Sequence, residues 1–322
     1  MTDHSLNNNL SIKNLIIGAG IAGLTLAKRF ESSGQDYLII EKSRGVGGRM
    51  ATRRLDLSTF DHGAQFFKIR SDQKSFWGSF FGSPLTHLWF SENHTDFYAS
   101  RSGMTQIAKS LANKDQLLLN EKFLTVQKSP AGYIAKTESM KTILCENIYL
   151  TCPLPQSLQF LKNSQISYDA NLNQIQYAKA LVGLFEIHTK SQLIQNFNYA
   201  ENLTDFIYSL SNQFNKGTSQ SLAFTITMQS DFSETHFDQT DAINLELVAK
   251  SFIHFLKNLD PDNDFFITKS ELKKWRYSHP TTTYPKSFYE VDTAKGIYLL
   301  GDAFLKSSLV GSIQSAEAVP IS

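Results

Sequence analysis

The sequence predicts an α/β protein of two interleaved domains, the first of which begins with a βαβ unit of the Rossmann type. The apolar run at residues 13–17 predicts a buried strand, residues 21–30 predict a helix, and residues 37–40 predict a second strand. A glycine-rich turn joins the first strand to the helix. The chain has 322 residues, which is long enough for two domains with separate hydrophobic cores.

The glycine-rich turn, Gly18-Ala19-Gly20-Ile21-Ala22-Gly23, has the spacing of a dinucleotide-binding fingerprint. Gly18 permits the tight turn, Gly20 lets the backbone approach a pyrophosphate, and Gly23 lets the helix pack closely on the strand. The first helical residues, Ile21 and Ala22, present free N–H groups and the positive end of the helix dipole to phosphates. The alternative is that the glycines serve only a tight βαβ turn.

A second group of signals follows the second predicted strand. Glu41 ends that strand, where a carboxylate can accept hydrogen bonds from an adenosine ribose. In the loop that follows, Gly47-Gly48-Arg49, the guanidinium can bind a second face of the pyrophosphate. A third segment, Asp61-His62-Gly63-Ala64-Gln65, comes soon afterwards.

Together these segments resemble the flavin-binding signature of the flavin amine oxidase superfamily, and they are most similar to its renalase-like bacterial FAD-dependent oxidoreductases. Nicotinamide dehydrogenases lack the Gly-Gly-Arg extension, so the resemblance implies FAD rather than NAD as the resident cofactor. Residues 102–109 resemble the point where the family returns to its FAD domain. Residues 273–278 are similar to the tryptophan motif of the renalase group. Residues 296–302 resemble the last strand of the FAD domain, whose Gly301-Asp302 pair contacts the cofactor.

The resemblance implies FAD contacts along much of the chain. The strands at Val126 and Thr151 are expected to approach the cofactor. A C-terminal helix beginning near Gly311 is expected to direct N–H groups at the reduced flavin, unless that glycine is only a helix cap. The expected FAD-binding residues are Gly18, Gly20, Ile21, Ala22, Gly23, Glu41, Lys42, Gly48, Arg49, Met50, His62, Gly63, Ala64, Gln65, Phe66, Val126, Thr151, Gly301, Asp302, Gly311, Ser312 and Ile313.

The expected FAD-binding domain is discontinuous and comprises residues 11–70, 100–155 and 285–322. Residues 71–99 and 156–284 are expected to form the substrate domain, and residues 1–10 a flexible tail. Pro153 and Pro155 are expected to end the second FAD-domain segment. The aromatic residues between positions 76 and 98 fit either a core or a pocket. The family's last helix usually continues further than Pro320 allows here.

The expected substrate-facing residues are His62, Gln65, Trp275 and Tyr277. Trp275 and Tyr277 lie two residues apart, so on a strand they share one face and can form a wall beside a planar substrate. The alternative is aromatic packing in a half-buried sheet. His62 follows the ring-adjacent motif, where it either acts on substrate or only orients the loop.

The composition excludes several other classes of protein. Thirty-one Lys and Arg against 30 Asp and Glu give no strong field for nucleic acid or an anionic membrane. No apolar run reaches the roughly 20 residues of a membrane span.

The chain has two cysteines, Cys145 and Cys152. A reduced cytoplasmic chain is therefore expected, with both cysteines as small buried residues. Neither cysteine lies near the C-terminal end, where the family's covalent flavin attachment occurs, so non-covalent FAD is expected. Residues 260–264 lack the glycine and glutamate of a calcium loop, and no metal is expected.

Three functions remain open at this level. The leading one is a renalase-like FAD enzyme that oxidises dihydronicotinamide, an NAD(P)H isomer, by hydride transfer and passes the electrons to molecular oxygen. The second is a flavin amine oxidase, which needs an aromatic cage and often a lysine beside the flavin. The third is a flavin-bound protein with a non-catalytic binding role. The sequence gives no oligomeric state.

Overall fold

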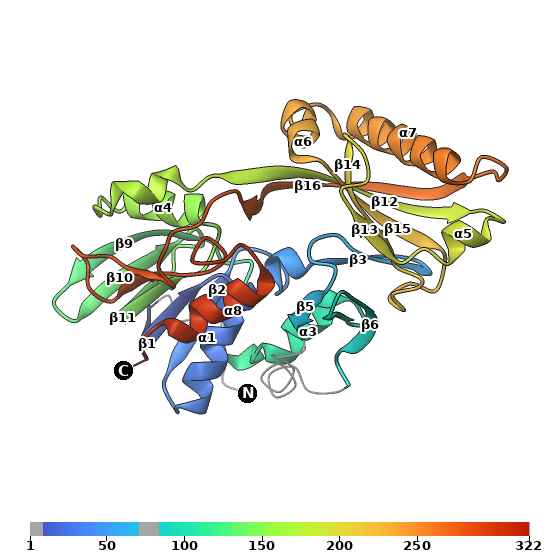
Figure 1. The fold of residues 1–322 in the computed structure, drawn as a ribbon. Helices are drawn as coiled ribbons and strands as arrows, with labels where there is room; N and C mark the ends of the chain where they lie inside the picture. The colour runs from blue at the N-terminus through green and yellow to red at the C-terminus, as the bar shows by residue number, and fades with distance from the viewer. Residues whose placement is uncertain (1–8, 71–83, 322) are drawn as a thin grey trace. The chain divides into compact units, whose positions relative to one another are not determined.

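The computed structural model describes residues 9–70 and 84–321, and it divides by internal contacts into two compact units (Figure 1). The divisions fall after residues 48, 107, 176 and 279. The first unit contains the two ends of the chain and residues 108–176, and the second contains residues 49–107 and 177–279. Both units are therefore interleaved along the sequence. Residues 49–70, which the sequence placed with the FAD-binding domain, pack within the second unit.

The first unit is built on a mixed eight-stranded sheet with the order β17-β18-β11-β1-β2-β8, to which β10 and β9 are added beside β11. The strands β18, β11, β1, β2 and β8 run parallel, and β17, β10 and β9 are antiparallel additions. The bounds are β1 (Asn9–Ile17), β2 (Tyr37–Glu41), β8 (Leu117–Leu119), β9 (Phe123–Ser129), β10 (Gly132–Thr137), β11 (Thr142–Leu150), β17 (Tyr289–Glu290) and β18 (Ile297–Leu299).

Helices cover this sheet. The helices are α1 (Ile21–Ser32), α4 (Leu154–Asn163) and α8 (Leu309–Ala318). Leu24, Leu26 and Phe30 of α1 are fully buried although they do not share one face, because α1 contacts β1, β2 and α8. Helices α1 and α8 run beside each other (Figure 1). The Arg29 guanidinium joins them by donating 2.7 Å hydrogen bonds to the carbonyls of Ala316 and Val319.

The register of the parallel strands brings their carboxyl ends to one edge. Ile17 of β1 pairs with Ile40 of β2 and with Leu150 of β11, and Leu150 pairs in turn with Leu299 of β18. The residues that follow these four strands therefore share an edge of the sheet. In open parallel sheets this is the edge where ligands bind.

The second unit is built on a five-stranded sheet with the order β13-β14-β15-β12-β16. On one face, α6 and α7 contact β12 over a core that includes Phe185, Phe224 and Phe252. On the other face, Phe60 packs on small residues of β12, and Trp275 joins the same cluster. The bounds are β12 (Tyr177–His188), β13 (Tyr199–Glu201), β14 (Ile207–Asn212), β15 (Ala223–Met228), β16 (Phe266–Pro280), α5 (Gln192–Gln195), α6 (Ser230–His236) and α7 (Asp241–Leu259).

Two smaller sheets complete the second unit. A hairpin pairs β3 (Thr52–Leu55) with β4 (Ser58–Asp61), and a three-stranded sheet has the order β5-β7-β6. Its strands are β5 (Phe67–Arg70), β6 (His87–Glu92) and β7 (Thr95–Ala99). Helix α3 (Met104–Leu111) continues from the second unit into the first.

The α/β fold and the order of its elements confirm the expected fold class, and several local predictions need correction. The strand predicted from residue 13 already begins at Asn9, within the predicted tail. The segment of the first unit that contains Pro153 and Pro155 continues to residue 176: Pro153 precedes α4, and Pro155 lies in its first turn, where a missing N–H costs nothing. The aromatic residues between 76 and 81 lie outside the described residues. None of the described helices is both long and apolar enough to cross a bilayer.

Candidate functional site

The candidate dinucleotide site lies on the ligand-binding edge of the first unit, where Gly18 and Thr151 follow β1 and β11 and Glu41 is the last residue of β2. Gly18 has φ +108°, a conformation that L side chains rarely adopt. A Cβ on Gly23 would lie 2.1 Å from the Gly18 carbonyl oxygen. These two glycines are therefore required by the backbone. The Thr151 hydroxyl fixes the turn further by donating 3.0 and 3.1 Å hydrogen bonds to the carbonyls of Ile17 and Gly18.

Gly20 differs from its two neighbours, because a Cβ there would meet no atom within 4 Å. It is the N-cap of α1 in extended conformation, and no side chain caps the helix. The first turn, which begins with Ile21 and Ala22, contains no acidic residue. Its N–H groups have no acceptor within the helix. An uncapped helix N-terminus beside open space is suited to binding an anion such as a pyrophosphate.

Glu41 is buried at this edge, and backbone amides hold its carboxylate. Its Oε2 accepts from the Ala19 N–H at 2.9 Å, and its Oε1 accepts from the Ser43 N–H at 2.8 Å. Each carboxylate oxygen can accept a further hydrogen bond. The Glu41 side chain can therefore hold the glycine loop in place and still accept from a ribose hydroxyl.

The second glycine loop packs on the first. The Gly47 N–H donates to the Ala19 carbonyl at 2.8 Å, and a Cβ on Gly48 would lie 3.5 Å from the Gly20 Cα. Gly48 also has φ +51°. Lys42 is exposed, and its ammonium bonds the Gln156 side chain at 3.2 Å. The glycines of this loop thus have a packing reason within the first unit, and the Lys42 side chain points to a neighbour on α4.

The last strand and the last helix of the first unit agree only partly with the prediction from the sequence. Gly301 follows β18 with φ +130°, and its N–H donates to the Ser315 hydroxyl at 2.9 Å. Asp302 is buried beside it. The predicted role of Gly311, Ser312 and Ile313 as free N–H donors is wrong, because α8 begins at Leu309.

The Gly311 and Ser312 N–H groups are already satisfied by the residue before the helix. They donate to the Ser308 hydroxyl and carbonyl, respectively, at 2.9 Å each. The groups without an intrahelical acceptor belong to Leu309 and Val310 instead. Gly311 is required for packing, because a Cβ there would lie 2.0 Å from the Lys306 carbonyl oxygen.

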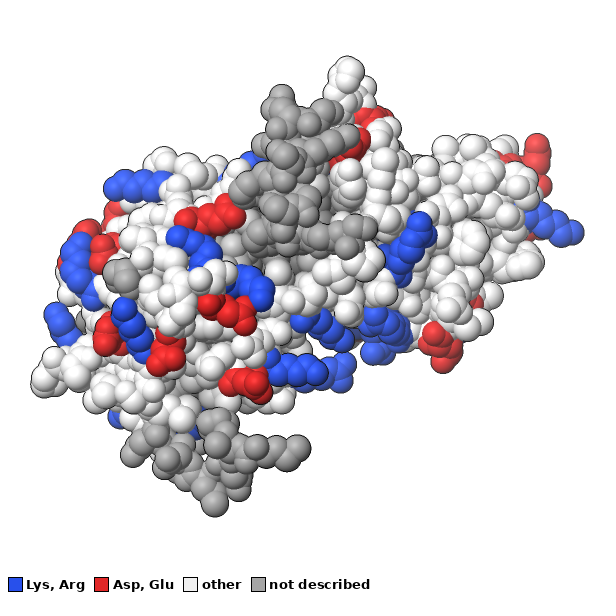
Figure 2. All heavy atoms as spheres, turned by 90° about the horizontal axis from the view of Figure 1, so that it is seen from below, with Lys and Arg blue, Asp and Glu red and all other residues white. Residues whose placement is uncertain are grey.

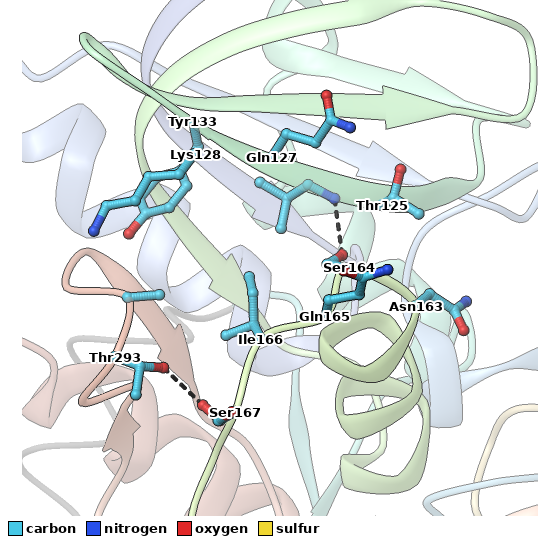
Figure 3. Close-up of a pocket in the computed structure, with 12 residues that line it drawn as sticks. Thr125, Gln127, Lys128, Tyr133, Asn163, Ser164, Gln165, Ile166, Ser167 and Thr293 are labelled. Carbon is cyan, nitrogen blue, oxygen red and sulfur yellow. Dashed lines mark hydrogen bonds between the residues drawn. The ribbon is translucent and has the colours of Figure 1, made fainter.

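Val126 lies away from the fingerprint loop. It is buried in β9, and its N–H donates to the Ser164 hydroxyl at 2.9 Å. It lines a polar cavity of about 530 Å³ between the β9–β10 hairpin and the segment that follows α4 (Figure 3). None of the described fingerprint residues lines this cavity. The segment just before β9 is nearer to Glu41, since the Glu121 N–H donates to the Glu41 carbonyl at 2.9 Å.

Arg49, predicted to bind pyrophosphate, has backbone partners in the second unit. Its guanidinium donates to the Ser278 carbonyl at 3.1 Å and lies over the Tyr177 ring. The Arg49 carbonyl accepts from the Ala64 N–H at 2.8 Å, and a Cβ on Gly63 would lie 1.9 Å from its oxygen. Gly63 is therefore required by close contact with the Arg49 backbone. Met50 is buried, and its carbonyl accepts from the Thr105 hydroxyl.

Gln65 lies in a buried polar network and has no free hydrogen-bonding capacity on its amide. Its Nε2 donates to the carbonyls of Asp61 and Gly63 at 2.7 and 3.1 Å. Its Oε1 accepts from Gln213 Nε2 at 2.8 Å and from Lys216 Nζ at 3.0 Å. A side-chain amide has two donors and two acceptor positions. This arrangement does not favour the predicted substrate-facing role of Gln65.

The rings of His62 and Trp275 form a stacked pair. Their ring centroids are 5.4 Å apart with an angle of 22° between the planes, and the Trp275 indole N–H donates to the His62 carbonyl at 2.7 Å. Burial, and then the Lys273 ammonium, lower the pKa of His62 from 6.5 to about 4. The imidazole is therefore neutral at pH 7. Its Nδ1 is buried without a hydrogen-bond partner among the described residues.

Tyr277 and Phe66 contact other rings of the second unit. Tyr277 packs edge-on to Tyr177 at 5.8 Å between centroids. Phe66 lies edge-on to Phe97 and Tyr199 at 4.9 and 4.8 Å, beside Trp89. In the described part of the chain, no three His, Cys, Asp or Glu side chains gather in a way that would hold a metal ion.

Residues 16–82 match the family model described as an NAD(P)-binding Rossmann-like domain. A 4,4'-diapophytoene desaturase of Staphylococcus haemolyticus (strain JCSC1435) is 32% identical over 111 residues, which are 32% of this chain and 21% of that protein. The enzyme of the same name from Staphylococcus aureus (strain Newman) is 46% identical over 52 residues, 16% of this chain and 10% of that protein. The chain thus matches about a fifth or less of the length of these relatives.

Solved structures resemble the whole chain at lower identity. A putative protoporphyrinogen oxidase from Exiguobacterium sp. 255-15 aligns with TM-score 0.69 and 13% identity over 96% of this chain and 98% of that one. A putrescine oxidase bound to putrescine aligns with TM-score 0.65 and 12% identity over the same fractions. The fold is thus that of these oxidases in both units, and the sequence similarity to the desaturases lies in a shorter region.

Lys216 bonds Gln65 in the buried polar network, and the sequence did not indicate it as a site residue. Its side chain is fully buried, and its ammonium pairs with the fully buried Asp61 carboxylate at 2.8 Å. The surrounding segment, Asn215-Lys216-Gly217, has the composition of an ordinary surface turn. No local signal distinguishes such a lysine from a solvated one.

Proposed function

We propose that the protein is an FAD-dependent oxidoreductase that binds its cofactor non-covalently. The single observation that supports this most is the edge of the first unit, where an uncapped helix N-terminus, open space at Gly20 and the buried Glu41 carboxylate occur together. These polar groups fit a dinucleotide: the N–H groups can donate to the pyrophosphate, and the carboxylate can accept from the ribose. Bound FAD would supply the hydride acceptor.

In this proposal the residues of the chain bind and orient. The first turn of α1 binds the pyrophosphate, and Glu41 holds both the glycine loop and the ribose. In the second unit, the loop from His62 to Gln65 is proposed to contact the flavin, with Gln65 shaping the loop through its saturated amide. His62 stays neutral, and Trp275 fixes its orientation. A neutral imidazole can donate or accept one hydrogen bond without adding charge.

We propose a dihydronicotinamide, an isomer of NAD(P)H, as the substrate, with oxygen reoxidising the reduced enzyme. Support comes from the similarity of residues 273–278 to the renalase-like tryptophan motif. A planar ring can stack on the aromatic side chains that this segment provides, and the stacked Trp275–His62 pair is such a surface.

A flavin amine oxidase is the second candidate, and a specific observation favours it. Phe66, Trp89, Phe90, Phe97 and Tyr199 form a cluster of rings in the second unit, and the Lys216 ammonium lies 5.7 Å from the Trp89 ring centroid. The amine-oxidase hypothesis requires aromatic walls, and a lysine beside the flavin often accompanies them. Putrescine oxidase is also among the structural neighbours.

Anaerobic reduction separates the candidates. The purified yellow protein would be mixed without oxygen with dihydronicotinamide isomers, with aliphatic and aromatic amines, and with NADH as a reference. Bleaching of the flavin absorbance near 450 nm by the isomers alone would support the proposal, whereas bleaching by an amine would favour the second candidate. A yellow protein that none of them reduces would support the non-catalytic role.

A further inference from the structure

A fully buried ion pair lies at the centre of the second unit. The Lys216 ammonium and the Asp61 carboxylate have no exposed side-chain surface and are 2.8 Å apart. Lys216 follows β14, and Asp61 is the last residue of β4. Burying two charges costs several kcal/mol per ion before their attraction is counted. Such a pair is often no more stable than apolar residues of the same size, so its presence needs another explanation.

The two charged groups bond one loop from both sides. Lys216 Nζ donates to the Gln65 backbone carbonyl at 3.3 Å and to its Oε1 at 3.0 Å. Asp61 Oδ1 accepts from the Met104 N–H at 2.8 Å and from the Thr52 hydroxyl at 2.5 Å. The Asp61 end of the 61–65 loop is therefore tied to β3 and to the first residue of α3, and the Gln65 end is tied to Lys216 in the turn after β14.

Gln213 closes the network from the same turn as Lys216. Its Oε1 accepts from the Asp61 N–H at 3.2 Å, and its Nε2 donates to Gln65 Oε1 at 2.8 Å. The Lys216 ammonium fixes which way the Gln65 amide faces, because Oε1 must point to the two donors. Nε2 is then left for the carbonyls of Asp61 and Gly63. Asp61 and Gln65, the two ends of the loop, are thus both bonded to Lys216 and to Gln213.

From this geometry we infer that Lys216 and Asp61 are positioning residues, which hold the His62–Gln65 loop in the one conformation that can meet the flavin. The inference rests on the proposed function for its flavin half. The structural half, that the pair fixes the loop, stands on the second unit alone. We infer that the pair fixes the loop because a buried charge pair has few alternative arrangements, whereas neutral amides in the same place can exchange partners.

The test uses the full chain with Lys216→Met, Asp61→Asn, and both substitutions together. The single Lys216→Met change leaves a buried carboxylate unpaired and is expected to lower the melting temperature strongly. The double variant has no unpaired charge. It is expected to recover most of the lost melting temperature, because the asparagine still has an oxygen that can accept from the Met104 N–H. Lys179→Met is the matched control, since Lys179 pairs with Glu234 at the surface of the same unit.

Two measurements report on the loop rather than on stability. Amide hydrogen exchange of Asp61 and Ala64, whose N–H groups bond Gln213 Oε1 and the Arg49 carbonyl, is expected to be at least about tenfold faster in the double variant. The flavin absorbance spectrum and the rate of anaerobic reduction at saturating substrate are expected to change in the double variant, the rate by about tenfold or more. Lys179→Met is expected to match the parent protein in all of these.

The outcomes discriminate clearly. A double variant that recovers the melting temperature together with the parent exchange rates, spectrum and reduction rate would overturn the inference, because the lysine would then only neutralise Asp61. A double variant that does not fold would also overturn it, since the pair would serve folding in general. If the parent protein binds no FAD, the proposed function fails, and the exchange rates still decide whether the pair positions the loop.

Discussion

Glu41 couples the glycine loop to the proposed ribose site. Its carboxylate already accepts two backbone N–H groups, so it is oriented before a ligand binds. When a side chain is already oriented, ordering it on binding costs less free energy, and the affinity is higher. The side chain therefore affects affinity in two ways, through the ribose contact and through the loop that faces the pyrophosphate.

We expect Glu41→Ala to weaken FAD binding by more than tenfold, about 1.4 kcal/mol or more, because hydrogen bonds to a charged group contribute about 1.5–3 kcal/mol each. Titration of apoprotein with FAD, followed by flavin fluorescence, measures the change. Glu138→Ala is the control, since Glu138 is exposed in the same unit and pairs with Lys122 at the surface. Parent affinity in the Glu41 variant would contradict the ribose role.

His62 gives the stability of the protein a predictable dependence on pH. Its pKa is lowered to about 4 in the folded protein, against an ordinary value of 6.5. Between these values the unfolded chain binds the proton and the folded chain does not. The free energy of unfolding therefore decreases as the pH falls from 6.5 to about 4.

Replacing His62 with glutamine removes this titration, so the free energy of unfolding should fall less steeply across that interval. Urea titrations at pH 7, 5.5 and 4.5 would measure it. His254→Gln, at an exposed position of α7, is the control variant. If the His62 variant retained the parent slope, the imidazole would not be held neutral by burial.

Trp275 supports His62 and packs on the Phe60 cluster, so its truncation should affect more than substrate. We expect Trp275→Ala to lower the melting temperature and the rate of flavin reduction together, since Trp275 is partly buried and its truncation costs part of the ~3–5 kcal/mol of a fully buried tryptophan. Trp275→Phe keeps an aromatic ring but loses the hydrogen bond to His62 and part of the stacked area, and it should be more stable than the alanine variant while reduction slows. Stopped-flow reduction beside thermal melting separates the two effects. Parent rates in a stable phenylalanine variant would remove Trp275 from the proposed site.

At the scale of elements, the first turn of α1 combines two different demands on glycine. Gly23 meets a steric demand, because its missing side chain makes room for the Gly18 carbonyl. Gly20 meets no such demand, because the space beside it is open. The two positions therefore distinguish folding from ligand binding within one turn of helix.

Gly23→Ala is expected to destabilise the first unit and to lower folded yield and FAD content together. Gly20→Ala should cost at most about 1 kcal/mol of stability, as alanine is a poorer N-cap than glycine. Its methyl group, however, would enter the space proposed for the pyrophosphate, so FAD affinity should fall at least about tenfold. Melting temperatures of the apoproteins and FAD titrations measure both effects. Normal FAD affinity in Gly20→Ala would place the pyrophosphate elsewhere.

At the scale of the whole molecule, the distribution of charge and the two cysteine thiols limit the chemistry that the protein can carry out. The net charge is +1, and acidic and basic side chains both occur across the face drawn in Figure 2. Such a distribution provides little long-range attraction for a polyanion. Burial raises the pKa of the Cys145 thiol to about 12 and that of Cys152 to about 11. Neither thiol is therefore a nucleophile near neutral pH.

We expect FAD to copurify with the protein and to be released intact by acid or heat. The reason is that covalent attachment needs a reactive side chain, and both thiols are protonated and buried or bonded within the first unit. Absorbance of the supernatant after precipitation measures the released flavin. Flavin that remained with the denatured chain would contradict this expectation, and a colourless protein that could not be reconstituted would contradict FAD binding altogether.

The sequence by itself determined the βαβ unit, the glycine turn and the acid at the end of the second strand. These features depend on periodicity and turn chemistry within about 30 residues, where local preference and tertiary position agree. The free N–H groups predicted at Gly311 failed because the cap at Ser308 shifted the start of the helix.

Only the tertiary structure decided the polar network and the support of His62. Asp61 and Lys216 pair across more than 150 residues of sequence, and Trp275 reaches the His62 carbonyl across 213. Nothing in the neighbours of Lys216 shows that it is buried, because a lysine in a polar turn is normally solvated. Its burial depends on a carboxylate supplied by a distant strand, and such a partner is visible only once the chain has folded.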